Sequence, residues 1–289
     1  MMTFLFWNCR KATDLVGKLV AEHRVDVLVL AESHAEPARI LSAIEDADGA
    51  RFEVDPLCQD IAIFTRFSAS ALQPEHDEPG LSIRRIPTVP EDILLVAMHL
   101  LSKDNASDAD QASLTPIYAA EIGRIERKLG MRRTLLVGDL NMNPFDHGVV
   151  QATGFHAISS RQVATQRGNR EKGGRTVDTR WYPYFYNPMW RFFGDAQGTP
   201  PGTFFRDKGG PIAYFWHLYD QVLIRPDLVP RFVDRDLMIL SQCGDIALVN
   251  AKGEPSASDH LPVLFRLNLE APGAIHGQAS DSEPRTAGP

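Results

Sequence analysis

The chain has 289 residues, 44% apolar and 23% charged, which is the composition of a globular protein with one large domain or two small ones. Three cysteines are too few for a disulfide framework or a zinc site, and a net charge of −7 argues against a protein that coats nucleic acid non-specifically. No apolar run is long enough to span a membrane, and the N-terminus lacks the basic region of a signal peptide. We therefore expect a soluble cytoplasmic protein.

Short apolar runs of strand length alternate with amphipathic stretches along the chain. Thr13 can cap a helix with its apolar face at Leu15, Val16, Leu19 and Val20. A weaker helix is expected near Pro37, and Thr115-Pro116 is expected to open a longer one. Strands are predicted at residues 3–7, 25–30, 61–65, 81–86, 93–98, 134–137, 219–224 and 261–267.

Two later segments differ from this pattern. Residues 155–215 are rich in Gly, Pro, Arg and aromatic residues and have poor periodicity, which predicts a long insertion of loops and short elements. Residues 271–289 have the composition of a disordered tail. We therefore expect a single domain over residues 1–270, followed by this tail.

Polar side chains lie at the ends of the predicted strands. They are Asn8, Glu32, Asp139, Asn141, Asp220, Asp259 and His260. Taken singly, each has an alternative explanation as a turn former, a loop residue or a satisfied edge residue. In a layered fold, however, strand ends meet at one rim, so these groups can share one cleft. Hard oxygen ligands suit Mg²⁺ or Mn²⁺, and carboxylates, amides and a histidine suit hydrolysis of a phosphate ester.

These residues sit in strings that resemble the endonuclease/exonuclease/phosphatase superfamily, the fold of pancreatic-type deoxyribonucleases and exonuclease-III-type enzymes. The strings are Trp7-Asn8, Leu30-Ala31-Glu32, Met98-His99-Leu100, Gly138-Asp139-Leu140-Asn141-Met142-Asn143-Pro144, Gly202-Thr203-Phe204, Tyr219-Asp220-Gln221-Val222-Leu223-Ile224 and Ser258-Asp259-His260-Leu261-Pro262-Val263. The resemblance implies an α/β (α+β) fold: a four-layer αββα sandwich of two mainly antiparallel sheets flanked by helices.

The resemblance also implies a role for each polar residue at a reaction centre. Glu32 would be the principal ligand of Mg²⁺ or Mn²⁺, with Asn8 and Asp259 completing the metal shell or ordering its waters. Asp139 would orient or deprotonate the attacking water. The residues that would contact the phosphate are Asn141, on one of its oxygens, and His260, kept cationic by Asp220.

The match departs from the family pattern around Glu32 and His99. Ala31 stands where many members carry glutamine. His99 matches a second histidine that can act as general acid, but its carboxylate partner is unclear, since Gln59 fits the expected place as well as Asp60 does. The alternative for His99 is a strand-end histidine without catalytic weight.

The insertion is locally basic in an acidic protein. Between positions 161 and 180 its basic residues are Arg161, Arg167, Arg170, Lys172, Arg175 and Arg180, and a run of aromatic residues follows. One interpretation is a substrate-binding loop, with Arg167, Arg170 and Arg175 on phosphates and Trp181 and Tyr184 stacked on bases or sugars. The alternatives are a solvated loop anchored by its aromatic residues, and a partner or dimer interface.

The residues are compatible with three functions. The favoured hypothesis is a metal-dependent phosphodiesterase, most specifically a nuclease, whose substrate is nucleic acid or another phosphodiester. A phosphomonoesterase acting on a small phosphorylated molecule or lipid headgroup could use the same centre. A non-catalytic binding module is disfavoured, because every central residue of the motif strings is present.

Overall fold

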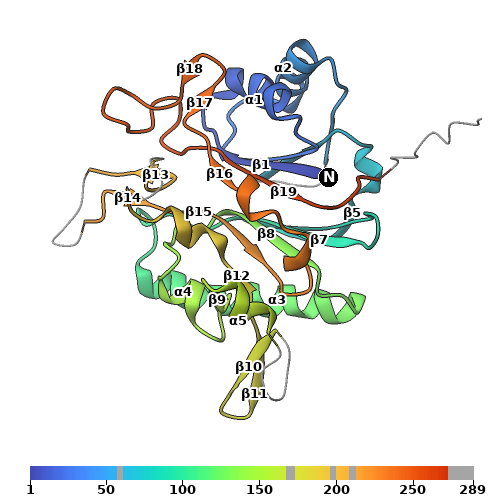
Figure 1. Cartoon of the computed structure of the whole chain (residues 1–289), viewed down its shortest axis with the longest axis vertical. Helices are drawn as coiled ribbons and strands as arrows, with labels where there is room; N and C mark the ends of the chain where they lie inside the picture. The colour runs from blue at the N-terminus through green and yellow to red at the C-terminus, as the bar shows by residue number, and fades with distance from the viewer. Residues whose placement is uncertain (57–60, 167–172, 196–199, 208–212, 273–289) are drawn as a thin grey trace, which may run out of the picture.

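Two β-sheets pack face to face, and helices cover their outer faces (Figure 1). The computed structural model describes residues 1–56, 61–166, 173–195, 200–207 and 213–272. Helices α1 and α2 lie on one side of the sheets, and α3, α4 and α5 lie on the other (Figure 1). The helices are α1 (Val16–His23), α2 (Pro37–Asp48), α3 (Asp108–Leu129), α4 (His147–Val150) and α5 (Arg161–Thr165). The predicted αββα sandwich is confirmed.

Both sheets mix parallel and antiparallel neighbours. The first has the order β16 (Met238–Ile239), β19 (Val263–Leu267), β1 (Met2–Asn8), β2 (Val27–Ala31), β4 (Ile61–Thr65) and β3 (Glu53–Val54). The second has the order β5 (Gln73–Glu78), β6 (Leu81–Ile86), β7 (Ile93–His99), β8 (Thr134–Asp139), β15 (Asp220–Ile224), β12 (Phe185–Tyr186) and β9 (Ala157–Ile158). The parallel pairs are β1–β2, β7–β8 and β9–β12.

Alternation along the strands of the second sheet builds two hydrophobic layers. In β7, Leu95 and Ala97 join the cluster that fills the space between the sheets. Val96 and Met98 point the other way, into the cluster that α3 covers with Ile122. Because successive side chains of a strand face opposite sides, an uninterrupted apolar run is what a strand buried on both faces requires.

Helix α3 begins seven residues before the predicted start at Thr115. Ser107 caps it, since its hydroxyl accepts from the Asp110 backbone N–H while the Asp110 carboxylate accepts from the Ser107 backbone N–H. Pro116 therefore lies inside the helix and leaves the Ala112 carbonyl without its usual donor. The Gln151 side-chain amide donates to that carbonyl at 2.7 Å, so the helix continues through the proline.

The remaining differences from prediction are local. Thr13 starts a short 3-10 turn, η1 (Thr13–Leu15), and makes no side-chain cap hydrogen bond. Strand β5 was not predicted, because its polar sequence Gln-Pro-Glu-His-Asp-Glu has no apolar alternation. The insertion supplies β9 and β12 to the edge of the second sheet. Its other elements include β10 (Gly174–Val177), β11 (Arg180–Pro183), η3 (Pro188–Phe192) and β13 (Phe204–Phe205), which pairs with β14 (Trp216–His217).

The shorter elements lie towards the C-terminus and between the main strands. They are η2 (Ala69–Ala71), η5 (Val229–Arg231), η6 (Asp234–Asp236), β17 (Gln242–Cys243) and β18 (Ile246–Ala247). Nearly all of the predicted tail falls outside the described residues. Among the helices that the described ranges contain, none combines the length and apolar composition that crossing a bilayer requires.

Candidate active site

The ends of the central strands bring the predicted polar residues to one edge of the sandwich. Asn8 ends β1, and Glu32 directly follows β2, its parallel neighbour. His99 ends β7, and Asp139 ends the parallel strand β8, opposite His99 in register. Asp220 begins β15 and pairs in register with Asp139. Strand pairing therefore joins Asn8 to Glu32 in the first sheet and His99 to Asp139 and Asp220 in the second, and the face-to-face packing of the two sheets brings the two groups together.

Gly138 makes the close approach before Asp139 possible. A Cβ atom built at this position would lie 1.9 Å from the Met98 carbonyl oxygen on β7. Any side chain here would push β8 away from β7. The glycine of the Gly-Asp-Leu-Asn string thus sets the spacing between His99 and Asp139.

Asn8 lies at the centre of a hydrogen-bonded group of carboxylates. Its side-chain Nδ2 donates to Glu32 Oε1 at 3.0 Å and to Asp139 Oδ2 at 3.1 Å. The side chain is fully buried, and its Oδ1 has no hydrogen-bond partner among the described residues. A buried acceptor without a donor is costly, so this atom is suited to a cation or to a water that a cation holds.

Arg10 links the two partly exposed carboxylates of the group. Its Nε lies 3.0 Å from Glu32 Oε2, and its NH1 lies 2.8 Å from Asp259 Oδ2. The hydrogen bond from His99, followed by the hydrogen bond from Asn8 and the positive charge of Arg10, holds the pKa of Glu32 well below its usual range despite burial. Glu32 is therefore anionic at any physiological pH.

This donor set fits Mg²⁺ or Mn²⁺. Glu32, His99 and Asp139 each offer a ligand atom, and the three atoms lie within 4.8 Å of one another. Glu32 and Asp259 supply further oxygens on either side of Arg10. The unpartnered Oδ1 of Asn8 adds a neutral acceptor. An oxygen-rich set with one imidazole suits these hard cations.

Asp220 and His260 form a buried ion pair next to Asp139. His260 Nδ1 lies 2.8 Å from Asp220 Oδ2, and its Nε2 lies 3.7 Å from Asp139 Oδ2. Burial disfavours the charged ring, but the charges of Asp220 and Asp139 outweigh it and raise the pKa of His260 to about 9. The ring is therefore a cation at neutral pH. Its Nε2–H is too far from Asp139 for a hydrogen bond, which leaves that proton for a substrate.

Among the described residues, the acidic partner of His99 is Glu32, which is itself one of the residues that could hold a metal. Its Nε2 lies 3.2 Å from Glu32 Oε1. Burial lowers the pKa of His99, but the hydrogen bond with Glu32 and the charge of Asp139 together raise it by more than burial lowers it. The net shift is therefore upward. The candidate partners at positions 59 and 60 lie outside the described residues.

Three residues of this edge have backbone conformations that L-amino acids rarely adopt. The φ angles are 43° at Arg10, 49° at Glu32 and 51° at Asn141. Such residues persist where their surroundings hold them, and here the Asn141 backbone N–H donates to Asp139 Oδ1 at 2.8 Å. The Asn141 side-chain amide donates to the Leu100 carbonyl at 2.9 Å, which leaves its second N–H available for a substrate oxygen.

The sequence profile of the Endonuclease/Exonuclease/phosphatase family matches residues 5–260, which includes every residue of this centre. The chain belongs to this family. Endonuclease/exonuclease/phosphatase enzymes hydrolyse phosphate ester bonds, and this chain is such a hydrolase. A comparison with curated proteins found no matching sequence.

Solved structures share the fold of this family member at low sequence identity. TDP2 from Caenorhabditis elegans is 13% identical, with a TM-score of 0.51 over 92% of this chain and 74% of that one. An AP endonuclease from Archaeoglobus fulgidus is 15% identical, with a TM-score of 0.51 over 93% of this chain and 100% of that one. D. rerio TDP2 complexed with a single-strand DNA product is 14% identical, with a TM-score of 0.50 over 91% and 97%. These likenesses support the fold.

Aromatic rings of this phosphoesterase continue outward from His260. Phe204 lies 4.6 Å from the His260 ring and 5.3 Å from Tyr219, between ring centroids. Tyr219 stacks on His217 at 4.6 Å, and His217 meets Tyr214 at 6.1 Å. Tyr214 is 49% exposed, so the row runs from the buried imidazole to the surface. We call Phe204, Tyr219, His217 and Tyr214 the aromatic row.

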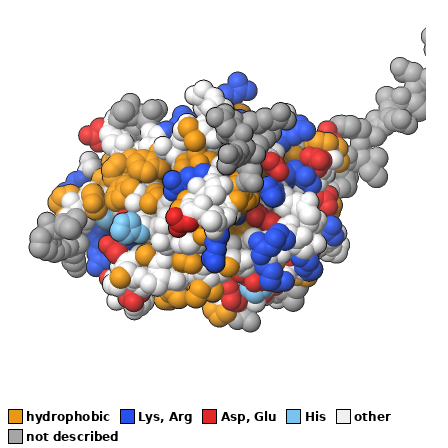
Figure 2. Space-filling view, turned by 90° about the horizontal axis from the view of Figure 1, so that it is seen from below, with side chains coloured by type: hydrophobic (Ala, Val, Ile, Leu, Met, Phe, Trp, Pro, Cys, Tyr) orange, Lys and Arg blue, Asp and Glu red, His pale blue; other side chains and the backbone are white. Residues whose placement is uncertain are grey.

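The row ends in a hydrophobic patch. Tyr214 lies 5.4 Å from Phe145, and Phe145 lies 5.5 Å from Phe193, which is 39% exposed. Figure 2 shows hydrophobic side chains gathered at the left of the molecule, the side on which β13 and β14 lie in Figure 1. The aromatic row therefore connects the His260 ring to a partly exposed apolar surface.

The insertion residues proposed for substrate binding lie elsewhere. Arg175 donates to His156 Nε2 at 3.0 Å, and Tyr184 packs its ring on His156 at 4.6 Å. Trp181 faces Arg132. Asp220 begins β15, and Arg225 follows the opposite end of this strand. The Arg225 guanidinium donates to the Tyr184 carbonyl. The structure therefore does not bring these three to the edge that carries Asn8, Glu32 and Asp139. Arg167 and Arg170 lie outside the described residues.

Sequence reasoning gave no role to Arg10, Asn143 or His217. Asn143 Nδ2 donates to His217 Nδ1 at 3.0 Å, and its Oδ1 accepts from the Leu218 backbone N–H at 3.1 Å. Burial, followed by the charge of Lys103, lowers the pKa of His217 to about 4, so the ring is neutral. The available signals were the position of Arg10 two residues after Asn8, and Asn143 two residues after Asn141.

Proposed function

We propose that this hydrolase is a divalent-metal-dependent phosphodiesterase, and specifically a nuclease. One observation carries the proposal: a carboxylate group held by Asn8 lies beside a cationic histidine that carries a free proton on Nε2. Asp139 belongs to both parts, since it bonds Asn8 and lies 3.7 Å from His260 Nε2. A phosphate between the two parts would meet, on one side, the cation that the carboxylates would hold and, on the other, the Nε2–H of His260.

Glu32, Asn8 and Asp259 would hold Mg²⁺ or Mn²⁺, with His99 and Asp139 close by. The bound ion supplies Lewis-acid polarisation of the phosphoryl oxygen. Arg10 holds Glu32 and Asp259 together from the solvent side. Its guanidinium is also suited to a non-bridging phosphate oxygen, because it can bind two oxygens at once.

Asp139 and His260 would act on the reacting atoms directly. Asp139 accepts one hydrogen bond on each oxygen, from Asn8 and from the Asn141 backbone, which fixes the plane of its carboxylate. Its remaining lone pairs can accept from a water and orient it for in-line attack. His260 Nε2–H donates to the phosphoryl oxygen, where charge develops, and Asp220 keeps the ring oriented and charged.

The aromatic row favours nucleic acid as the substrate class. Stacking on aromatic side chains is how proteins commonly hold unpaired bases. The row begins 4.6 Å from the catalytic imidazole, so a base adjacent to the scissile phosphate could reach it. The D. rerio TDP2 structure holds a single-strand DNA product, which supports a substrate of the same type here.

A substrate panel tests the proposal. Purified full-length protein with Mg²⁺ or Mn²⁺ is assayed on single- and double-stranded DNA, RNA, inositol phosphates and phospholipid headgroups, with EDTA as the metal-free control. We expect hydrolysis of at least one nucleic acid that EDTA abolishes. Hydrolysis of only the inositol phosphates or headgroups would overturn the nuclease assignment, and metal-independent hydrolysis would overturn the proposed mechanism.

A further inference from the structure

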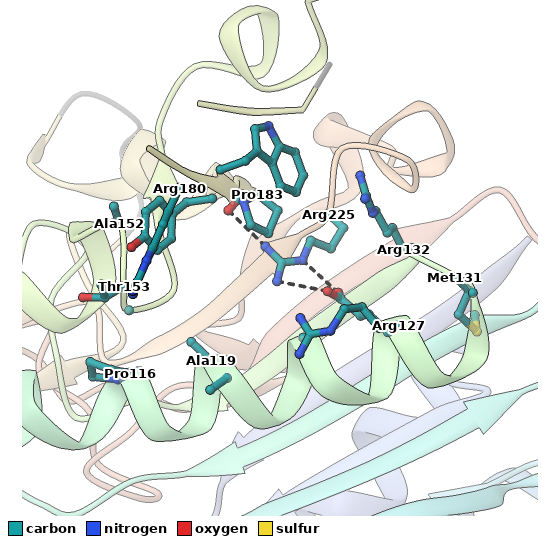
Figure 3. A pocket seen from close by; sticks show the side chains of 17 residues that line it. Pro116, Ala119, Arg127, Met131, Arg132, Ala152, Thr153, Arg180, Pro183 and Arg225 are labelled. Atoms are coloured by element: carbon teal, nitrogen blue, oxygen red, sulfur yellow. Dashed lines mark hydrogen bonds and ion pairs between the residues drawn. The ribbon is translucent and has the colours of Figure 1, made fainter. Parts of the chain in front are cut away.

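A large pocket opens on the outer surface of α3, between this helix and the β10–β11 hairpin (Figure 3). Its volume is about 880 Å³, within the range of roughly 300–1,000 Å³ that organic ligands occupy. Small residues of α3, Ala119, Ala120 and Gly123, leave this space along the helix surface. We call it the α3 pocket.

The α3 pocket is separate from the catalytic edge. Arg225 lines it and directly follows β15, whose first residue is the catalytic Asp220. A strand advances about 3.3 Å per residue, so Asp220 and Arg225 lie about 17 Å apart along β15. Arg132, another lining residue, precedes β8 at the end away from Asp139.

The walls of the pocket are held in place by a buried ion pair. Arg225 Nε lies 2.8 Å from Glu126 Oε1, and both side chains are almost fully buried. The same guanidinium donates to the carbonyls of Pro183 and Tyr184 at 3.2 and 3.1 Å. These bonds fasten the hairpin to α3 (Figure 3), so a ligand would enter a preformed cavity.

The charge of the pocket is positive in a protein of net charge −7. Arg127, Arg132 and Arg180 line it and come from α3, the turn after α3, and β11. None of the three makes an ion pair with any acidic side chain in the described part of the chain. Among the described residues, Glu126 is the one acidic residue of the lining, and it is already paired with Arg225. Three guanidinium charges thus remain for an anion.

Most of the remaining lining is apolar or aromatic. Met131, Pro116 and Pro183 contribute apolar surface, and Trp181 and Tyr182 contribute rings. The Arg132 guanidinium lies 4.8 Å from the centroid of the Trp181 ring. An inorganic anion would leave most of this volume and apolar surface unused. A ligand with an anionic group and a planar heterocycle matches both parts.

We propose that the α3 pocket is a second binding site, separate from the catalytic centre, for a nucleoside monophosphate. Its phosphate is held by Arg127 and Arg132, Arg180 adds positive charge on the other side of the pocket (Figure 3), and its base lies against the apolar and aromatic wall. The site requires no metal and takes no part in hydrolysis, so it stands independently of the proposed nuclease activity.

Calorimetry with adenosine 5′-monophosphate on the full-length protein in EDTA tests the site. We expect saturable binding that weakens at least about tenfold in the Arg127→Ala/Arg132→Ala protein, because two charge-assisted contacts are lost. Arg124→Ala is the matched control, since Arg124 is an exposed arginine of α3 that pairs with Glu121 and does not line the pocket. Glu32→Ala is the second control, and both should bind as the wild type does.

Gly123→Leu tests the pocket without removing charge. A Cβ at Gly123 would contact only Arg127 NH1, at 3.2 Å, so a leucine projects into the cavity, and it favours the helix. We expect this protein to keep its melting temperature and lose the nucleotide. Absence of saturable binding by the wild type, or equal binding by Gly123→Leu, would overturn the proposal. So would inorganic phosphate or a single-stranded oligonucleotide binding more tightly than the nucleotide at this site.

Discussion

Strands β8 and β15 carry a buried ion pair at each end, and the two pairs differ in kind. At one end, the titratable His260 pairs with Asp220 beside Asp139. At the other, the permanently charged Arg225 pairs with Glu126, which also accepts from the Thr134 hydroxyl at 2.6 Å. A histidine can hold and release a proton, whereas an arginine cannot at physiological pH. We therefore expect the buried charges to serve chemistry at the His260 end and to fix the structure at the Arg225 end.

Removing the imidazole should have the largest effect on activity. His260→Ala takes away the Nε2–H that faces the phosphoryl site, so kcat should fall by roughly 10²–10⁴-fold. Steady-state kinetics on the best substrate of the panel measures it. Circular dichroism should show an unchanged fold. A kcat within a few-fold of the wild type would contradict the role of His260.

Breaking the Arg225–Glu126 pair should lower the stability of the protein and leave its chemistry unchanged. Glu126→Ala leaves the buried Arg225 guanidinium without its carboxylate, which should lower the free energy of unfolding by roughly 3–5 kcal/mol. Urea denaturation measures this loss. At a temperature where the variant is folded, its kcat should match the wild type. A large loss of kcat with no loss of stability would reverse the assignment of the two ends.

The pKa of His260 tests whether Asp220 keeps the imidazole protonated. In metal-free protein the ring should titrate near pH 9, above its ordinary value of 6.5. Because the folded pKa is raised, the stability it contributes is full below pH 6.5 and is lost as pH rises to about 9. Asp220→Asn removes one of the charges that raise the pKa, so NMR titration should give a lower value. An unchanged value would show that Asp220 does not hold the proton.

Of these substitutions, Arg10→Ala should have the smallest effect. Its guanidinium neutralises Glu32 and Asp259, so it competes with a cation for the same oxygens. Arg10 is nearly half exposed, and exposed pairs contribute little, so Arg10→Ala should tighten Mn²⁺ binding by at most about fivefold. Calorimetry without substrate measures the affinity. Weaker Mn²⁺ binding in this variant would show that Arg10 assists the ion.

Much of the fold was predictable because buried strands have a strong local signal. The runs over β4 and β6 were predicted at their observed bounds. The start of α3 was not, because Pro116 suggested a first turn while the helix depends on a distant side chain, Gln151, to pass through that proline. Tertiary contacts of this kind have no local signal.

The candidate site divides in the same way. Residues at strand ends, such as Glu32 and Asp139, could be found in the sequence because each lies next to a buried apolar run and strand ends meet at one rim of a layered fold. Arg10 and the partner of His99 could not, since both depend on which side chain turns towards Glu32. The α3 pocket depends on where a hairpin packs, and sequence periodicity contains no information about that.

We propose that the edge built from Asn8, Glu32 and Asp139 is a metal-dependent phosphodiesterase centre. The most direct test is hydrolysis of labelled single-stranded DNA under single-turnover conditions, with Mn²⁺ or EDTA, by the wild type and by folded Glu32→Ala protein. We expect cleavage by the wild type that requires Mn²⁺ and no detectable cleavage by Glu32→Ala. Cleavage by Glu32→Ala at the wild-type rate would contradict this proposal.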